Sequence, residues 1–443
     1  MHHRVAATLA LVPVVSACTA RTNPLVGSAN AQGDTAGFLL GLWHGIIFPF
    51  AFVGSLFVDG VSVYEVHNSG AWYNFGLCVA AIALALTVAF FPSAIPARFT
   101  AEHSAADWRT ALLSDRLAWA HPHFAIVSVT AKSLENFEYV LPINRGHLAD
   151  LVEATYKAGA SGIGLDFYFT RPTEEKADRR LFSVLQDARE KVVIGIYEYD
   201  LSSEALKYQY DMIERTGVGA GYIDLVPDRD RVIRYRADPI LGARVSQSFP
   251  SALVQKAVGK ASVESPRIAW LLPPSENQAA FTKITSHELL AMKPEERLAL
   301  LKDRIVLIGG ELFSLDRHPT PLSIRSEKDM FGVEIHTHMA AELKDGDRSY
   351  SELSGPQTRL LVGGLALLGL ILGARFQTRE WDYLDWRVVS IFVIGLDMVI
   401  FKLFHVILPF TLAAVGWIAG VTAGTQMWKA ASFARRIIWR GND

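Results

Sequence analysis

Phe124-Ala125-Ile126-Val127-Ser128-Val129 is a short and nearly continuous apolar run, which is typical of a strand buried on both faces. From this run onward, similar segments alternate with amphipathic stretches of helical period. Further strands are predicted at 162–167, 192–196, 220–225 and 304–309, and helices at 145–158, 178–190 and 332–343. This alternation indicates an α/β fold with a mostly parallel sheet covered on both faces. Residues 265–286 are less regular, and we expect a β insertion there.

The composition is that of a hybrid between a membrane protein and a globular protein. Of 443 residues, 50% are hydrophobic and 20% are charged, and the longest uncharged stretches lie before Arg98 and after Arg359. The net charge of -2 leaves no basic surface of the kind that binds nucleic acid, so nucleic acid is not an expected partner. Cys18 and Cys78 lie outside the α/β region, which excludes a disulfide framework and a thiolate metal site there.

Residues 1–18 have the features of a bacterial secretory signal. A short polar start containing Arg4 precedes an apolar run that is too short to cross a membrane. The run ends in Val15-Ser16-Ala17-Cys18, which resembles the lipobox of bacterial lipoproteins. We therefore expect Cys18 to be lipidated, with an uncleaved signal anchor as the alternative.

Apolar segments of spanning length lie on both sides of the α/β region. Two transmembrane helices are predicted within 37–91, and three within 359–427 at 360–374, 388–404 and 406–427. Residues 1–90 also resemble small uncharacterised bacterial membrane proteins that carry a lipoprotein-like signal. The chain is therefore expected to be a multi-pass protein of the bacterial inner membrane, in contact with the lipid bilayer.

Basic residues predict the orientation of these spans. Arg375, Arg379 and Arg387 flank one loop, and the tail at 428–443 is basic, so both should be cytoplasmic. Counting back through the spans places residues 99–355 on the outer, periplasmic side.

The predicted spans contain polar residues and regularly spaced glycines. His44 is interpreted as a packed, hydrogen-bonded histidine or as a functional group, and Asp397 as a functional group or as a contact to a neighbouring helix. Glycines spaced by four allow helix backbones to approach closely, within one chain or between two, and a homodimer is expected. These glycines are Gly369, Gly373, Gly416, Gly420 and Gly424.

Several landmarks occur in the α/β region in a recognisable order. They are Ile126–Thr130, Pro142–Arg145, Ala158–Asp166, Asp178, Gly221–Asp224, Asp228–Arg234, Arg304–Gly310, Asp316–Pro321 and Gly332–His336. Together they resemble the extracytoplasmic sensory domain called the CHASE domain of type 2, or CHASE2. The chain departs from that pattern at Leu141, where tryptophan is commoner, and at Arg231, where glycine usually follows the aspartate.

The resemblance implies a membrane-anchored sensor with three transmembrane helices after the sensory domain. In that family a kinase, cyclase or diguanylate cyclase follows. Here a short basic tail follows, so we expect a sensor without its own output that acts through a separate signalling protein. Two alternatives stay open: a structural subunit of a membrane assembly, and a periplasmic metal-dependent hydrolase.

The candidate ligand-binding residues lie near the predicted carboxyl ends of parallel strands, where α/β folds place their ligands. In the hydrolase alternative, some of these residues, together with His338 and Glu342, would bind a metal ion or act as a catalytic acid and base. The spacing fits no recognised zinc motif, so we predict no metal, no other cofactor and no enzyme activity. Asp316 and Thr320 have a second interpretation as residues that order a turn. The candidates are Asp166, Arg145, Asp316, His318, Thr320 and His336.

Overall fold

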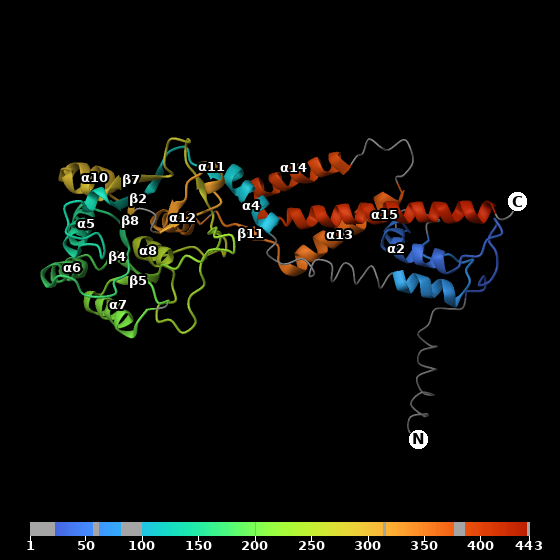
Figure 1. Cartoon of the computed structure of the whole chain (residues 1–443), viewed down its shortest axis with the longest axis horizontal. Coiled ribbons are helices and arrows are strands. Elements are labelled where there is room, and N and C mark those ends of the chain that lie inside the picture. The colour runs from blue at the N-terminus through green and yellow to red at the C-terminus, as the bar shows by residue number, and fades with distance from the viewer. Residues whose placement is uncertain are drawn as a thin grey trace, which may run out of the picture. The chain divides into compact units, whose positions relative to one another are not determined.

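The computed structural model describes residues 23–55, 62–80, 100–199, 201–312, 316–346, 348–375 and 386–440. The chain forms two compact units. The helical unit comprises residues 1–97, 355–383 and 412–443, and the α/β unit comprises residues 98–354 and 384–411. Each unit is described by itself below (Figure 1). Cys18 lies outside the described residues, so its lipidation stays a prediction.

The α/β unit is built on a six-stranded parallel sheet with the strand order β5-β4-β3-β8-β2-β7. The inner strands are mostly buried runs, because helices cover both faces, while the edge strands β5 and β7 are only partly buried. The strands are β2 (His121–Thr130), β3 (Gly162–Asp166), β4 (Val192–Ile196), β5 (Gly219–Tyr222), β7 (Phe281–Thr285) and β8 (Ile305–Glu311).

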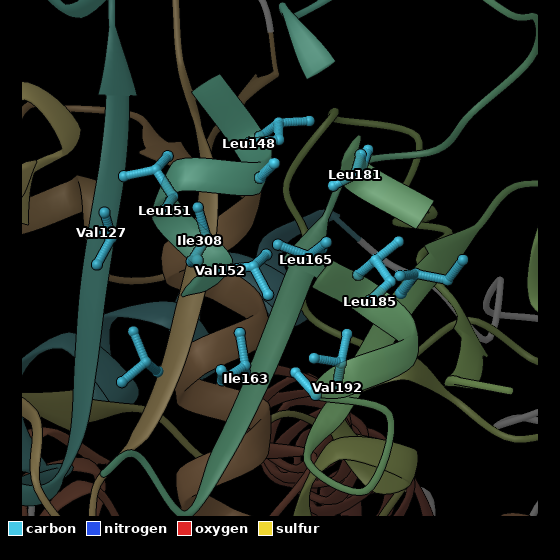
Figure 2. Packing of buried hydrophobic residues seen from close by; sticks show 14 of the residues in the cluster. Val127, Leu148, Leu151, Val152, Ile163, Leu165, Leu181, Leu185, Val192 and Ile308 are labelled. Carbon is cyan, nitrogen blue, oxygen red and sulfur yellow. The ribbon is translucent and has the colours of Figure 1, made fainter. Parts of the chain in front are cut away.

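Helices cover the two faces of the sheet unequally (Figure 1). One face carries α5 (Arg145–Lys157), α6 (Glu175–Asp187), α7 (Ser203–Thr216), α9 (Ser286–Ala291) and α10 (Pro294–Leu301). The other face carries α8 (Phe249–Val258) and α12 (Gly332–Asp345). Figure 2 shows the first layer, in which leucines and valines of α5 and α6 pack on β2, β3, β4 and β8.

The α/β unit contains further helices and short strands outside the central sheet and its two helix layers. These are α4 (Thr100–Leu113), β1 (Asp115–Arg116), η1 (Lys132–Leu134), β6 (Leu271–Leu272), β9 (Arg317–His318), α11 (Ser323–Ser326), β10 (Met330–Phe331), β11 (Ser351–Glu352), α14 (Trp386–Phe404) and β12 (Val406–Ile407). Strands β9 and β10 form an antiparallel pair around α11, and β11 pairs with β12 in parallel.

The predicted α/β class and mostly parallel sheet are confirmed, with β4 found at the predicted residues. The expectation for residues 265–286 is wrong in one respect. The strand β7 in this segment is the edge strand of the central sheet, paired in parallel with β2, and not part of a separate insertion. As an edge strand it has one buried residue, Phe281, and carries exposed Lys283 at its centre, which weakens the apolar signal.

The helical unit contains α2 (Phe38–Ser55), a helical segment at 71–80, α13 (Gly355–Arg375) and all of α15 (Phe410–Arg440) except its first two residues. Among the residues that the structure describes, one helix, Gly355–Gly373, is long and apolar enough to cross a membrane. Phe38–Phe48 and Phe410–Thr425 are apolar but shorter. The predicted two spans before and three after the α/β region are therefore not confirmed and stay predictions.

Four of the five predicted packing glycines lie where α13 and α15 of one chain meet. A Cβ atom at Gly420 would collide with the carbonyl oxygen of Ala366, and one at Gly373 with that of Val421. Gly369 and Gly416 make similarly close approaches, while Gly424 lies one turn further along α15. The close approach that glycine permits is thus used within one chain.

His44 of α2 also has an intrachain partner. Its Nδ1 lies 2.6 Å from the Tyr73 hydroxyl, and the two rings meet edge to face. This geometry agrees with the interpretation of a packed, hydrogen-bonded histidine.

Candidate functional site

The carboxyl edge of the sheet brings together four of the predicted ligand residues, here called the sheet-edge cluster: Asp166, Asp316, His318 and His336. Asp166 is the last residue of β3, and His336 lies one turn into α12. The helix reaches this position because β8 carries Gly309 near its carboxyl end, where a Cβ atom would collide with Val333. His336 Nε2 then lies 3.7 Å from Asp166 Oδ1, with side chains only 3% and 6% exposed.

Asp316 and His318 form the more exposed half of the cluster. His318 Nε2 lies 2.9 Å from Asp316 Oδ1, and half of the Asp316 side chain is open to solvent. The Asp316 carboxylate lies against Gly332, the first residue of α12, where a Cβ atom would collide with it. The amino end of a helix favours a negative charge, so this position stabilises the carboxylate.

Burial shifts both inner groups of the cluster toward their neutral forms. It raises the pKa of Asp166 well above the usual range, and the nearby charge of Asp316 raises it further. Burial lowers the pKa of His336 to about 4, against the opposing effects of Asp316 and the Ile223 backbone. The pair can therefore exchange hydrogen bonds with a polar ligand while His336 stays neutral at neutral pH.

Arg145 and Thr320 are engaged elsewhere. Arg145 lies over the ring of Phe169 at 4.4 Å, and its Nε lies 3.7 Å from Asp178 Oδ1. Thr320 accepts and donates within a turn, where its N–H bonds to the Ser323 hydroxyl at 2.9 Å. The turn interpretation of Thr320 fits this geometry.

Glu342 and His338, which a metal-dependent hydrolase would need at the sheet-edge cluster, form hydrogen bonds with other residues instead. Glu342 accepts hydrogen bonds from Arg236 at 2.7 Å, Ser265 at 2.9 Å and the Ala269 N–H at 3.0 Å. His338 Nδ1 accepts from the Leu271 N–H at 3.3 Å. Within the described ranges, no three His, Cys, Asp or Glu side chains are placed to hold a metal ion.

A second buried cluster was not predicted, and we call it the α4 joint: Asp107 and Arg109 of α4, Arg234, and Asp397 of α14. Arg234 is 1% exposed and donates from Nε and Nη2 to both oxygens of Asp107, at 2.8 and 2.5 Å. It also bonds Asp228 at 3.0 Å and Asp230 at 2.7 and 2.8 Å. All three guanidinium nitrogens are therefore engaged by carboxylates.

The other half of the α4 joint ties α4 to α14. Arg109 Nη1 contacts both Asp397 oxygens at 2.5 and 2.6 Å, and the guanidinium also donates to the Leu408 carbonyl at 3.1 Å. Glu102, two turns earlier on the same face of α4, accepts from the Thr411 N–H at 2.7 Å. Asp397 therefore has the helix contact that was one of its two predicted roles, made to α4.

A cavity of about 650 Å³, here called the hairpin pocket, lies beside β7, β8, α12 and the β9–β10 pair. Its walls include two glutamates, Glu311 at the end of β8 and Glu334 in the first turn of α12. Lys283 of β7 lies between them, with its Nζ 2.5 Å from Glu311 and 4.0 Å from Glu334. Phe331 and Met330 add an apolar surface.

A family model for the CHASE2 domain matches residues 79–388, well over half of the chain. The chain belongs to the CHASE2 family. CHASE2 domains are extracytoplasmic sensory domains, so the chain carries such a domain. No curated protein and no solved structure matches the chain in the corresponding searches.

The structure explains a CHASE2 landmark at 228–234. Its two aspartates hold Arg234, and neither serves only as a turn residue. Arg231, directly after the second aspartate, has a φ of 69°, the left-handed conformation that glycine adopts without strain. This explains why glycine is usual there, and why the departure at Arg231 does not alter the bonds of Arg234.

The residues of the α4 joint were missed because their partners are far apart in sequence: Arg109 and Asp397 are 288 positions apart. One signal was present. An acidic residue inside an apolar helix requires a cationic partner, and Arg109 lies before the first strand of the sheet in a helix that also carries Asp107.

Proposed function

We propose that this CHASE2 protein is a sensor, and that ligand occupancy of its α/β unit changes the position of α14 through the α4 joint. The observation that carries this proposal is the division of α4 between two partners. Asp107 holds Arg234 of the CHASE2 fold, and Arg109 holds Asp397 of α14.

The geometry of α4 lets it connect these two partners rigidly. Residues two apart in an α-helix point about 200° away from each other, so Asp107 and Arg109 leave nearly opposite faces of α4. A shift of Arg234 is thereby passed across the helix to Asp397.

The energetics favour movement of the joint as one body. Removing one partner of a buried ion pair costs about 3–5 kcal/mol, which is more than a small shift of packed helices requires. The apolar contacts agree, because Phe401 of α14 is fully buried against Tyr350, their ring centroids 5.4 Å apart.

The membrane side of the proposal follows from the basic flanks. Arg375, Arg379, Arg387 and the basic tail support a cytoplasmic carboxyl terminus in a bacterial inner membrane, with several spans. We propose that the helices pass the signal to a separate output protein, in a homodimer, and that the chain itself is not catalytic.

The test uses the full chain in detergent micelles. A library of metabolites and cell-envelope fragments is screened for a raised unfolding midpoint, and hydrogen exchange is then measured at residues 100–113 and 395–411. We expect at least one compound to stabilise the protein and to change exchange in both segments. In the Asp397→Asn variant the change at 395–411 should be lost, while the control Asp211→Asn, on exposed α7, should retain it.

The alternatives give different results. Stable co-purification of other membrane subunits, without stabilisation by any compound, would show a structural subunit instead. A metal in the purified protein that His318→Ala and His336→Ala both remove would support the hydrolase.

A further inference from the structure

The hairpin pocket has an unbalanced charge at its inner wall. Two carboxylates, Glu311 and Glu334, face one ammonium group, that of Lys283. Lys283 is 2.5 Å from Glu311 but 4.0 Å from Glu334, beyond the length of a normal hydrogen bond. Glu334 therefore lacks a close cationic partner among the described residues.

The environment of Glu334 increases the cost of this imbalance. Burial raises the pKa of its carboxyl, and Glu311 raises it further, against the opposing effect of Lys283. A second cation beside Glu334 would relieve both effects, because an opposite charge within a few ångströms stabilises the ionised form.

The remaining walls fit an apolar body. Phe331 and Met330 of β10 line the pocket, together with Leu271, Leu272 and Leu322. The volume of about 650 Å³ lies within the range of small-molecule sites, which is about 300–1,000 Å³.

Three arginines around the pocket are already engaged, and Lys328 is a further basic residue of its lining. Arg325 bonds Glu276 at 2.8 Å, Arg317 lies over the Phe331 ring at 4.3 Å, and Arg116 donates to the Pro273 carbonyl at 2.8 Å. An anionic ligand would have to compete with these contacts, whereas a cation meets an unmatched carboxylate.

We propose that the hairpin pocket binds a small organic amine, whose ammonium group pairs with Glu334 and Glu311 and whose apolar body lies against Phe331 and Met330. The inference deepens the proposed sensor function by naming the class of ligand, and it rests on that function only for the signal that binding produces.

The experiment compares three probes of the same shape and different charge: 2-phenylethylammonium, 2-phenylethanol and 3-phenylpropionate. Their affinities for the full chain in detergent micelles are measured by calorimetry. The ammonium probe should bind most tightly. Glu334→Gln should weaken it roughly tenfold, the size expected for one charge-assisted hydrogen bond.

Two further variants keep the test decisive if Glu334→Gln disturbs folding. Lys283→Met removes the competing ammonium group and should tighten binding of the ammonium probe. Glu214→Gln, on α7 and outside the pocket lining, should leave its affinity unchanged. Tighter binding of 3-phenylpropionate, no binding of any probe, or equal affinities in the parent, Glu334→Gln and Lys283→Met would each overturn the proposal.

Hydrogen exchange separates this inference from the sensor function. Binding of the ammonium probe without any change at residues 395–411 would keep the ligand class and contradict the sensor. Stabilisation by another compound that changes exchange there, with no binding of the ammonium probe, would do the reverse.

Discussion

The sheet-edge cluster and the α4 joint are both buried groups of charged residues in one α/β unit, but they differ in how completely they are bonded. In the joint, every guanidinium nitrogen of Arg234 and both Nη atoms of Arg109 are engaged, and only Arg109 Nε has no hydrogen bond with a described residue. In the cluster, His336 and Asp166 are 3.7 Å apart, and His336 Nδ1 forms no well-formed hydrogen bond with a described residue.

The two clusters also differ in whether their buried groups stay charged. Burial alone would lower the pKa of Arg234, but its bonds to Asp230, Asp107 and Asp228 raise it above the usual value. In the sheet-edge cluster burial dominates, raising the pKa of Asp166 and lowering that of His336. We therefore interpret the joint as a rigid, charged connection and the cluster as a neutral site that responds to its surroundings.

The largest expected effect comes from Arg234→Met. The substitution removes the cation that three neighbouring carboxylates share, so the free energy of unfolding should fall by about 3–5 kcal/mol. It is measured from the slowest-exchanging amides of β2, β3 and β8 in the full chain.

The matched control for Arg234→Met is Arg244→Met, which removes an ion pair to Glu214 with side chains 60% and 63% exposed. This loss should cost less than about 1 kcal/mol. Equal costs for the two variants would show that the joint is not a rigid connection.

The next largest effect is the pH dependence of His336. Its folded pKa is about 4, below the unfolded value of about 6.5, so between these pH values the unfolded chain takes up a proton that the folded chain does not. Stability should therefore be lost as the pH falls from about 6.5 to 4, by about 3 kcal/mol in total from this residue.

Asp166 opposes this trend, because its raised pKa adds stability at low pH, so the comparison is made with His336→Asn. The variant should lose about 1.4 kcal/mol less per pH unit than the parent between pH 6 and 4.5. Parallel curves for parent and variant would mean that His336 is already charged in the folded protein.

The sequence predicted part of the sheet-edge cluster but not the α4 joint. Asp166 and His336 were predicted together because they follow or face the carboxyl ends of parallel strands, which meet at one edge of a sheet. Arg145 was predicted for the same reason, but Asp178 and Phe169 lie closer to it and take up its guanidinium.

The joint was beyond prediction because it is a product of tertiary packing. Arg234 lies in a landmark that supplies two of its carboxylates, but its third carboxylate, Asp107, comes from 127 positions away. In the fold, β4 is a continuous buried run and was predicted at its residues, whereas β7 alternates with polar residues because it is an edge strand.

A smaller effect is expected for Asp107→Asn, which keeps the shape of the side chain and removes one of the three negative charges around Arg234. Hydrogen bonds to a charged group contribute about 1.5–3 kcal/mol, so the free energy of unfolding should fall by about 2 kcal/mol. The same amides of β2, β3 and β8 report it. A loss as large as that of Arg234→Met would mean that the Asp107–Arg234 pair alone accounts for the stabilisation that Arg234 provides.

The smallest effect is expected for Asp166→Asn, and its sign separates the two clusters. A carboxyl with a raised folded pKa contributes stability below its unfolded pKa of about 3.9 and loses it as the pH rises through the folded value. At pH 7 the parent therefore carries a cost that an uncharged amide of the same shape does not. Asp166→Asn should be as stable as the parent or more stable, by about 1 kcal/mol or less, because the new amide must still find hydrogen-bond partners. A destabilisation like that of Asp107→Asn would mean that Asp166 is ionised and paired with a charged His336, so that both clusters are held by the same interaction.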